Sequence, residues 1–530
     1  MQTKYLKIGK ATELLGKDRV LYRILEIFPG FLSLGTLIGL IILSYFKPVI
    51  AACFIIAFNI YWLLLVLYLS IYLIISYRKM QKNIKIDWKE KCYNLVQQPV
   101  CKIDENNNKI NDCLAKEGLN WKDIIQVVFL PTYREDIEII RSTLEAIIKD
   151  GYPLEKIIIV LGLEKREGSD AIKKGEIIAQ EFGDKFRNLL ITVHPDKDGE
   201  LKGKGANQAW MAKEVKEKII DQDKIDYKKI LVSVFDIDTI ISSSYFFCLT
   251  YLFLTIKDPY KASYQPIPIY HNNIWQAPFF ARITANSNTF WQMMQQIRVE
   301  KLATYSSHSM TWQALVDVDF WSTRMVSEDS RIFWHCFCYY NGNYRVEPMY
   351  FPVSMDITMD NTILRTFKNL YKQQRRWGWG VENLPYLMFN VIKNWSDIPK
   401  SKFINRLLVQ IHGFHSWATN AIIIGIIGWM PILIGGDNFN SSVLSSSLPL
   451  ISRKLMLCAM IGMIISAIIS TLFLPPKPKN YSIYKIILMP LQWIILPISI
   501  IIFGSVPGLE SQIRLMLGKY LGFEVTLKKR

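Results

Sequence analysis

The chain has 530 residues, 50% of them hydrophobic, and a formal net charge of +17. Because many apolar residues form a few uninterrupted runs, the part that folds in water is smaller than the length suggests. Lys and Arg gather beside these runs, where anionic lipid and the positive-inside bias account for them, so no nucleic-acid partner is expected.

The N-terminal region predicts a membrane hairpin. Two apolar runs, 31–45 and 50–77, are separated by Lys47 and Pro48. The second run is long enough to span a hydrocarbon core of about 30 Å. Basic residues precede the first run and follow the second, which favours a cytoplasmic location for both ends. The first run could alternatively be a buried helix of a soluble domain. We therefore expect a basic cytoplasmic segment at 1–30 and a transmembrane hairpin at 31–77.

The segment 78–400 is predicted to be a cytoplasmic α/β domain. Short apolar, β-branched runs alternate with helical patterns, which is typical of βαβ units and a parallel sheet. Strands are expected at 124–130, 157–161, 189–193 and 230–235, and helices at 136–149, from residue 171 and from near residue 207. Ligands of such sheets gather at the carboxyl ends of the strands.

Apolar runs resume after residue 400, at 417–434, 455–474 and 486–503. The connector after the first run carries no Lys or Arg, which is typical of an external loop. The connector after the second run contains lysines, which is typical of an internal loop. The third run contains Pro490 and Pro497, and a full crossing would leave a basic C-terminus outside, so we interpret it as re-entrant or in-plane. This gives four full spans, a C-terminal transmembrane region at 401–505 and a terminal segment at 506–530.

The eight cysteines include no CxxC pair. Cys92, Cys101 and Cys113 lie in the part assigned to the cytoplasm, where thiols stay reduced, so no disulfide framework is expected. Cys336 and Cys338 are interpreted as core side chains rather than metal ligands.

Two carboxylates follow the strand expected at 230–235. Asp236 and Asp238 would emerge at the edge of the sheet, where carboxylates suit Mg²⁺ or Mn²⁺ that bridges to the phosphates of a substrate. Taken alone, a DxD sequence is more often a solvated turn. Thr132, Tyr133 and Glu135 follow the first expected strand and should lie at the same edge.

Glu328 and Asp329 form a second acidic pair, with aromatic residues on both sides that would limit water access. A hydroxyl group is a poor nucleophile, and a partly desolvated Asp can remove its proton. Asp329 is therefore the candidate base. Alternatively, Ser327 or Asp329 caps a helix that begins near Arg331.

Two basic segments are further candidates for binding a substrate. Lys204 and Asn207 lie in a glycine-broken segment before a helix, whose N-terminus attracts anions such as a pyrophosphate. An ordinary basic loop is the alternative. Gln373, Arg376 and Trp377 lie in an amphipathic pattern typical of a helix on a membrane surface. Arg can hold a phosphate in a two-pronged contact and Trp offers a face to a substrate ring, although a simple membrane anchor is the alternative.

In this order, the signatures resemble those of the membrane-embedded family 2 glycosyltransferases, which include cellulose synthase catalytic subunits, hyaluronan synthases and chitin synthases. The resemblance implies a GT-A (Rossmann-like) nucleotide-sugar-binding domain flanked by transmembrane α-helices. It also implies an inverting enzyme at the inner (plasma) membrane, with its catalytic domain in the cytoplasm. Such an enzyme transfers a sugar from a UDP- or GDP-sugar to a growing polysaccharide, with synthesis coupled to export.

The resemblance also implies a role for each acidic signature. Asp236 and Asp238 would bind Mg²⁺ or Mn²⁺ and the nucleoside diphosphate. Asp329 would be the catalytic base, with Glu328 beside it in the (T/S)ED motif. The other residues expected to contact the nucleotide sugar are Thr132, Tyr133, Glu135, Lys204 and Asn207.

The basic signature and the C-terminus match two further motifs of that family. In QxxRW, Arg376 would contact the diphosphate, and Gln373 and Trp377 the acceptor at the entrance of a transmembrane channel. The segment that looks like the FxVTxK gating loop, which closes over bound nucleotide sugar, supplies Phe523, Val525, Thr526 and Lys528.

Two departures limit the resemblance. The aspartate pair that reads the nucleotide base is absent, and Glu164 stands in that region as a substitute. The acceptor-side FFCGS-like motif is also missing, with 306–310 in its place. Two other functions therefore stay open: a non-processive transferase that adds one sugar to a lipid-linked acceptor, and a catalytically inactive transporter or scaffold.

Overall fold

The structure is a computed structural model that describes residues 5–102, 113–479, 482 and 489–522. The strands are β1 (Ile125–Pro131), β2 (Ile157–Glu164), β3 (Asn188–His194), β4 (Ile230–Val234), β5 (Ile240–Ile241), β6 (Ala262–Tyr270), β7 (Ser309–Thr311) and β8 (Arg345–Met355). The helices are α1 (Gly16–Phe46), α2 (Pro48–Ile84), α3 (Trp88–Gln97), α4 (Ile137–Lys149), α5 (Ser169–Phe182), α6 (Lys204–Val215), α7 (Tyr245–Thr255), α8 (Phe279–Ile297), α9 (Trp312–Asp317), α10 (Glu328–Tyr339), α11 (Ile363–Gly378), α12 (Asn383–Lys393), α13 (Lys400–Gly425), α14 (Met430–Ile434), α15 (Gly436–Asn440), α16 (Val443–Leu472), α18 (Leu496–Ile500) and α19 (Val506–Met516).

The strands form one mixed sheet with the order β3-β2-β1-β4-β7-β6-β8-β5. The strands β3, β2, β1 and β4 are mutually parallel, with Val128 of β1 opposite Ile159 of β2 and Ser233 of β4. β7 pairs antiparallel with both β4 and β6 and so joins the parallel half to the other strands. The parallel half is the set of βαβ units that the sequence predicts.

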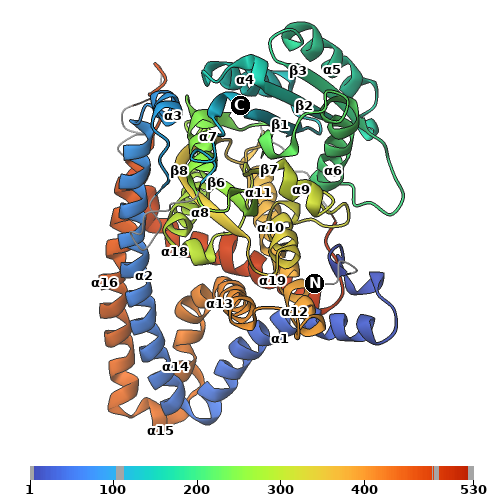
Figure 1. Ribbon diagram of the computed structural model, residues 1–530. Coiled ribbons are helices and arrows are strands. Elements are labelled where there is room, and N and C mark those ends of the chain that lie inside the picture. Colours follow the sequence, from blue (N-terminus) through green and yellow to red (C-terminus); the bar gives the residue numbers. More distant parts are fainter. Residues whose placement is uncertain (1–4, 103–112, 480–481, 483–488, 523–530) are drawn as a thin grey trace.

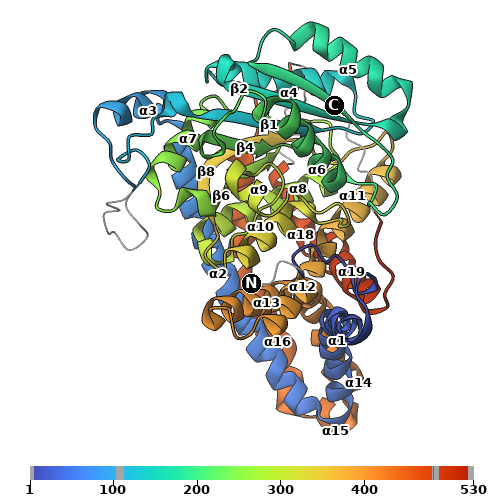
Figure 2. The same ribbon diagram turned by 45° about the vertical axis from the view of Figure 1, so that its right-hand side comes forward.

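The sheet is covered by helices on both faces. In β1, Val128 and Leu130 belong to the apolar cluster that contains residues of α4, α5 and α7, whereas Val127 and Phe129 belong to the cluster with α6, α9 and α10. Successive side chains of a strand point to opposite faces, so the two clusters lie on opposite sides of the sheet. Figure 2 shows α4 and α5 above the strands and α6, α9 and α10 below them. Burial on both faces explains why these strands read as continuous apolar runs.

Within the described residues, four helices are long and apolar enough to cross a membrane. They are α1, α2, α16 and the stretch Met489–Met516, which includes α18 and α19. A fifth candidate, Lys400–Gly425 with Ile427–Ile434, is bent by 43°. The expected span at 417–434 is therefore broken, whereas the third C-terminal run is long enough to qualify. In Figure 1, α2 and α16 run side by side along one edge, while α18 and α19 cross beneath the α/β part.

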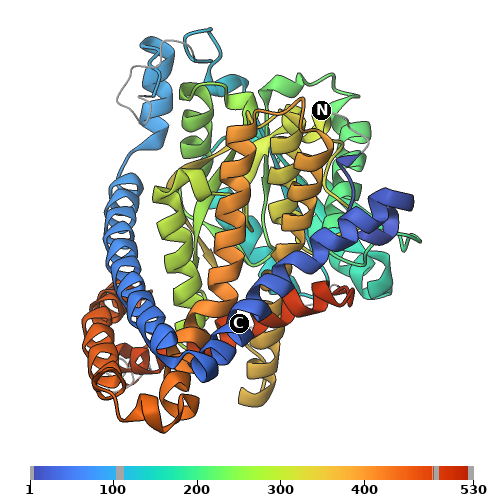
Figure 3. The ribbon, with the colours of Figure 1, turned by 90° about the horizontal axis from the view of Figure 1, so that it is seen from below.

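The first helix begins at Gly16, well before the apolar run that predicted it. Tyr22 and Leu25, in its early turns, pack with Tyr5, Ile8 and Phe389. Tertiary packing therefore extends the helix beyond its apolar run. The helix then passes α19, and the two run side by side when the molecule is seen from below (Figure 3). Ser33 Oγ donates to Gln512 Oε1 at 2.6 Å in this contact.

The expectation that the cysteines form no disulfide is wrong for one pair. Cys101 and Cys113 form a disulfide, with their Cα atoms 5.8 Å apart. The neighbouring backbone amides of Lys102 and Ala115 donate to the carbonyls of Thr255 and Leu254 at 2.8 and 3.0 Å. Both segments are therefore attached to the C-terminal end of α7, which brings the cysteines together. Cys336 and Cys338 are buried free thiols in the core, as expected.

Candidate active site

The carboxyl ends of β1 and β4 lie at the same edge of the sheet, because Phe129 and Val234 are paired in parallel register. Phe235 N then donates to Phe129 O at 3.0 Å. Asp236 follows directly and leaves the sheet at this edge, with 26% of its side chain exposed. The first acidic residue of the DxD sequence thus lies where a ligand of such a sheet is expected.

Lys204, the first residue of α6, joins the two acidic signatures. Its Nζ donates to Asp236 Oδ1 at 2.6 Å and to Asp329 Oδ2 and Oδ1 at 2.9 and 3.1 Å. These residues come from β4, α6 and α10, which are far apart in the sequence. The structure therefore brings Lys204, Asp236 and Asp329 into one cluster.

The lysine offsets part of the negative charge of this cluster. Burial alone would lower the pKa of Lys204, but the negative charges of Asp236 and Asp329 outweigh burial and raise this pKa above the ordinary value. The ammonium is therefore fully charged at neutral pH and compensates the carboxylates around it. One largely buried ammonium therefore connects the two acidic residues.

Asp329 lies in the first turn of α10, with 20% of its side chain exposed. The alternative that Ser327 caps this helix with its side chain is wrong, since Ser327 occupies the N-cap position without a capping bond. The Ser327 backbone N–H and Oγ instead donate to Glu382 Oε1 at 3.0 and 2.6 Å. Thr304 Oγ1 donates to the carbonyl of Asp329 at 2.6 Å. The candidate base is thus held by residues from two other segments.

Glu328 is buried beside Asp329. Burial, and then the charge of Asp329, raise the pKa of the Glu328 carboxyl to about 8. Glu328 is therefore mostly protonated at neutral pH, whereas Lys204 carries the compensating charge of the cluster. Two adjacent acids in different environments can take different roles, with Glu328 neutral and Asp329 next to the cation.

Asp238 is fully buried, and its Oδ2 accepts a hydrogen bond from Asp356 N at 2.8 Å. The carbonyl of Asp238 accepts another from Asn272 Nδ2 at 3.1 Å. Burial raises the pKa of Tyr270, and the charges of Asp236, Asp238 and Asp329 raise it further. The pKa of Tyr270 thus responds to all three carboxylates.

No group of three or more His, Cys, Asp or Glu side chains that could hold a metal ion occurs among the described residues. Asp236 and Asp238 still fit Mg²⁺ or Mn²⁺, because such ions bind one or two carboxylates and complete their shell with substrate phosphates and water. The Lys204 ammonium already lies against Asp236. A cation at Asp236 would thus take over part of the role of Lys204.

The residues of QxxRW lie on α11 near the same cluster. Gln373 is buried, and its Oε1 accepts from Thr358 Oγ1 at 2.8 Å. The ring of Trp377 lies 6.2 Å from that of Tyr270, centroid to centroid. The positive charge of Arg376 lowers the pKa of both Glu328 and Tyr270, although burial outweighs it in each case. Trp377 thus packs near Tyr270, and Arg376 contributes positive charge to the surroundings of Glu328.

The segment after β1 lies at the same edge but is held by its own contacts. Thr132 N donates to Gly162 O at 2.8 Å, and Tyr133 N donates to Glu135 Oε2 at 2.5 Å. The ring of Tyr133 lies 4.3 Å from the guanidinium of Arg166 and 5.0 Å from that of Arg134. Both guanidinium groups therefore lie within cation–π distance of the Tyr133 ring.

Glu164 and Asn207 are engaged elsewhere. Glu164 is buried, and its Oε2 lies 3.3 Å from His194 Nδ1 and 3.2 Å from Arg166 Nε. Asn207 Nδ2 donates to Gly162 O at 3.1 Å. Arg166 thus contacts both Glu164 and the Tyr133 ring. The Asn207 side chain connects α6 to the end of β2.

Sequence reasoning missed several neighbours of the cluster. Ser306 Oγ donates to Asp236 Oδ2 at 2.6 Å. His308 is fully buried, and its pKa is lowered by burial while the charge of Asp329 opposes that shift. Ser306 and His308 belong to the segment where the FFCGS-like motif is missing, which was the only signal for them. The expected gating residues Phe523, Val525, Thr526 and Lys528 lie outside the described residues.

No protein-family model and no curated protein sequence matches the chain. Among solved structures, a mannosyltransferase from Pyrobaculum calidifontis in complex with GDP-Man and Mn²⁺ is 13% identical with a TM-score of 0.40 and covers 76% of this chain and 98% of its own. TarS of S. aureus, residues 1–349, is 11% identical with a TM-score of 0.33 and covers 65% and 90%. GalNAc-T7 with UDP, GalNAc and Mn²⁺ is 10% identical with a TM-score of 0.29 and covers 59% and 61%. Likenesses this distant do not assign an activity to this chain.

Proposed function

We propose that this protein is a membrane-bound inverting glycosyltransferase of the family 2 type. It takes a sugar from a UDP- or GDP-sugar and adds it to a growing polysaccharide, with synthesis coupled to export. The α/β part, which we propose to be a GT-A domain, faces the cytoplasm at the inner (plasma) membrane. The candidate membrane helices α1, α2 and α16 anchor it there.

One observation carries the proposal. A single ammonium, Lys204 Nζ, lies within 3.1 Å of carboxylates from both acidic signatures, Asp236 and Asp329. Such a cluster at the carboxyl edge of a parallel sheet suits a phosphorylated donor and a hydroxyl acceptor. A scaffold or transporter would not need two acidic groups positioned around one buried cation.

The donor diphosphate meets positive charge from several directions. Lys204 and Arg376 stabilise the negative charge that develops on the departing nucleoside diphosphate. Asp236 and Asp238 hold Mg²⁺ or Mn²⁺, which supplies further neutralisation of phosphate charge when bound. The nucleotide base stacks near Tyr133, with Thr132 and Glu135 beside it.

Asp329 acts as the base. Its carboxylate accepts the proton of the acceptor hydroxyl while the hydroxyl oxygen forms a bond to the anomeric carbon. The bond from that carbon to the diphosphate oxygen breaks in the same displacement, and the diphosphate leaves with the electron pair. Gln373 and Trp377 position the acceptor, and a single displacement inverts the configuration at the anomeric carbon.

A donor screen tests the proposal. The purified full chain is incubated with each common UDP- and GDP-sugar in the presence of Mg²⁺ or Mn²⁺, and release of nucleoside diphosphate is measured. We expect metal-dependent release with one donor class and a ladder of long products. Products of one added sugar on a lipid would favour the non-processive alternative, and no release with any donor would favour a scaffold.

A further inference from the structure

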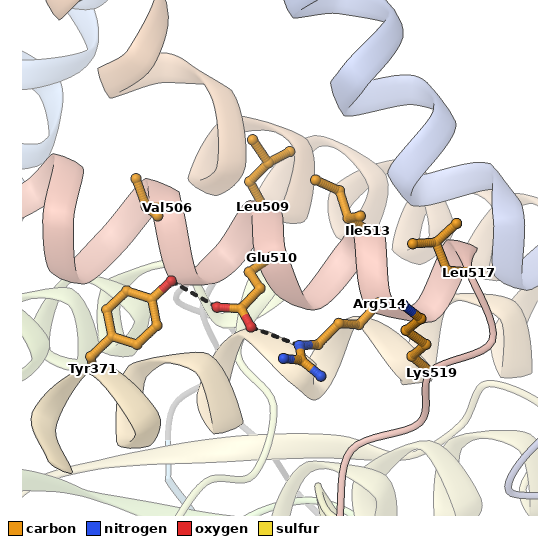
Figure 4. Close-up of a pocket in the computed structure, with 8 residues that line it drawn as sticks. All are labelled: Tyr371, Val506, Leu509, Glu510, Ile513, Arg514, Leu517 and Lys519. Atoms are coloured by element: carbon orange, nitrogen blue, oxygen red, sulfur yellow. Dashed lines mark hydrogen bonds and ion pairs between the residues drawn. The ribbon is translucent and has the colours of Figure 1, made fainter. Parts of the chain in front are cut away.

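A groove lies between α11 and α19, away from the acidic cluster. It has a volume of about 490 Å³ and is lined by Tyr371, Val506, Leu509, Glu510, Ile513, Arg514, Leu517 and Lys519. Figure 4 shows Tyr371 reaching toward Glu510 from α11, while most of the other residues lie along α19. The groove combines an apolar wall with a charged centre.

The apolar wall is a stripe on one face of α19. Val506, Leu509, Ile513 and Leu517 follow one another at intervals of three or four residues, which places them on one side of a helix. Val506 is 39% exposed and Leu517 is 57% exposed. The helix belongs to the stretch Met489–Met516, which is apolar enough to lie in a membrane. An acyl chain is the apolar partner that such a wall meets there.

The charged centre is built around Glu510. Its carboxylate accepts hydrogen bonds from Tyr371 Oη at 2.7 Å, from Arg375 Nη1 at 2.8 Å and from Arg514 Nε at 2.7 Å. The side chains of Arg375 and Arg514 thus both contact this carboxylate, and Lys519 lines the same groove. The residues that line the groove include two cations, Arg514 and Lys519, and one carboxylate, Glu510, so the lining carries a net positive charge.

Arg514 and Lys519 have binding capacity left. Arg514 contacts Glu510 through Nε, and within the described part of the chain its terminal nitrogens have no hydrogen-bond partner. A guanidinium donates five N–H bonds in a plane and can grip a phosphate with two of them. The exposed Lys519 adds a second cation beside the same groove (Figure 4).

From this arrangement we infer that the α11–α19 groove binds an anionic phospholipid, with its phosphate on Arg514 and Lys519 and an acyl chain along Val506, Leu509, Ile513 and Leu517. Basic pockets beside membrane helices recognise anionic headgroups in this way. A soluble phosphate would leave the apolar wall in water, and a zwitterionic lipid would not compensate the excess charge. Because Tyr371 and Arg375 belong to α11, the lipid fastens the helix that carries Gln373, Arg376 and Trp377 to the membrane.

Photo-cross-linking of the full chain tests this inference. The protein is reconstituted in phosphatidylcholine nanodiscs doped with phosphatidylglycerol that carries a diazirine on one acyl chain, and labelled peptides are mapped by mass spectrometry. We expect labelling within 506–517. Arg514→Gln and Lys519→Gln should each lower the apparent affinity about fivefold, since one basic side chain contributes about that factor to binding an anionic lipid.

Controls separate the site from general membrane contact. Lys85→Gln, which removes an exposed basic residue just after α2, should change nothing. Leu517→Glu changes an exposed position, so the fold is retained. The new carboxylate should reduce labelling, because it disfavours the acyl chain and repels the lipid phosphate. Equal labelling by phosphatidylcholine carrying the same diazirine, or equal loss in Lys85→Gln, would overturn the inference. Full competition by glycerol 3-phosphate would overturn it in favour of a soluble ligand.

Discussion

At the scale of single residues, Lys204 determines the state of the candidate site. Its ammonium reduces the repulsion between the carboxylates of Asp236 and Asp329, and between these carboxylates and a diphosphate. A ligand that carries its own cation can place that cation on Asp236. The Lys204 ammonium can then contact the ligand phosphate instead. The contact between Lys204 and Asp236 thus holds both side chains at the place where we propose that the donor phosphate binds.

We expect Lys204→Met to reduce kcat/KM for sugar transfer roughly 100-fold or more, as is usual when a charged group that stabilises a developing anion is lost. The matched control is Lys202→Met, because Lys202 is 62% exposed and pairs with Asp196 at the surface. The control should retain activity within about twofold. Equal activity of the two variants would remove Lys204 from the site.

The raised pKa of Glu328 has a consequence for stability. The carboxyl binds its proton more tightly in the folded chain, with a pKa of about 8 against an ordinary value of 4.5. Between these values the folded state holds more protons than the unfolded state, so the free energy of unfolding falls as the pH rises.

We therefore expect the Tm of the wild-type protein to fall more than that of Glu328→Gln between about pH 5 and about pH 8, because glutamine does not ionise. Differential scanning fluorimetry of both proteins in the same detergent measures this. Parallel Tm curves for the two proteins would show that Glu328 does not titrate in this window.

At the scale of elements, the close approach of α6 and α10 positions the cluster. A Cβ added at Gly205 would come within 2.7 Å of Ser322 O and 2.9 Å of Glu328 Cβ. Gly205 follows Lys204 directly, and Glu328 precedes Asp329. The absence of a side chain at residue 205 therefore allows Lys204 to reach Asp329.

Gly205→Ala should separate the two helices, lower the free energy of unfolding by about 1–3 kcal/mol as overpacking does, and reduce sugar transfer. Gly413→Ala in α13 is the control, since a Cβ there meets nothing within 4 Å. Chemical unfolding and activity are measured on both variants. If Gly205→Ala behaved like the control, the helix contact would not set the geometry of the site.

The sequence predicted the parallel half of the sheet well and the membrane helices less well. The strands β1 to β4 and the helices α4 to α6 appear where apolar runs and helical patterns predict them, because local pattern and burial agree there. The early start of α1 depends on packing against Tyr5 and Phe389, which hydropathy does not reveal. The bend after Gly425 likewise interrupts a run that is apolar throughout.

At the scale of the whole molecule, the residues of the candidate cluster were easier to name from the sequence than the residues that contact them. Asp236, Asp329 and Lys204 could be named because their motifs place them after a strand or at a helix start. Ser306 and His308 could not be named from the sequence, because their contacts form only when the loop before β7 folds against β4. The Cys101–Cys113 disulfide was not expected, because the segment was assigned to the cytoplasm and the sequence does not reveal that both cysteines lie beside the end of α7.

The arrangement of the helices links the candidate site to the membrane part. One face of α11 carries Gln373 and Trp377 near the acidic cluster, while Tyr371 and Arg375 contact Glu510 of α19. α19 in turn packs along α1, as Figure 3 shows. A ligand at the acidic cluster and a lipid in the α11–α19 groove would thus act on the same helix from opposite sides.

The most direct test of the central claim is a comparison of the wild-type protein with Asp329→Asn, using the donor that the screen identifies. The account predicts that Asp329→Asn abolishes sugar transfer while it binds the nucleotide sugar with nearly unchanged Kd, because Asp236 and Lys204 stay in place. Transfer at a rate close to that of the wild-type protein would contradict it.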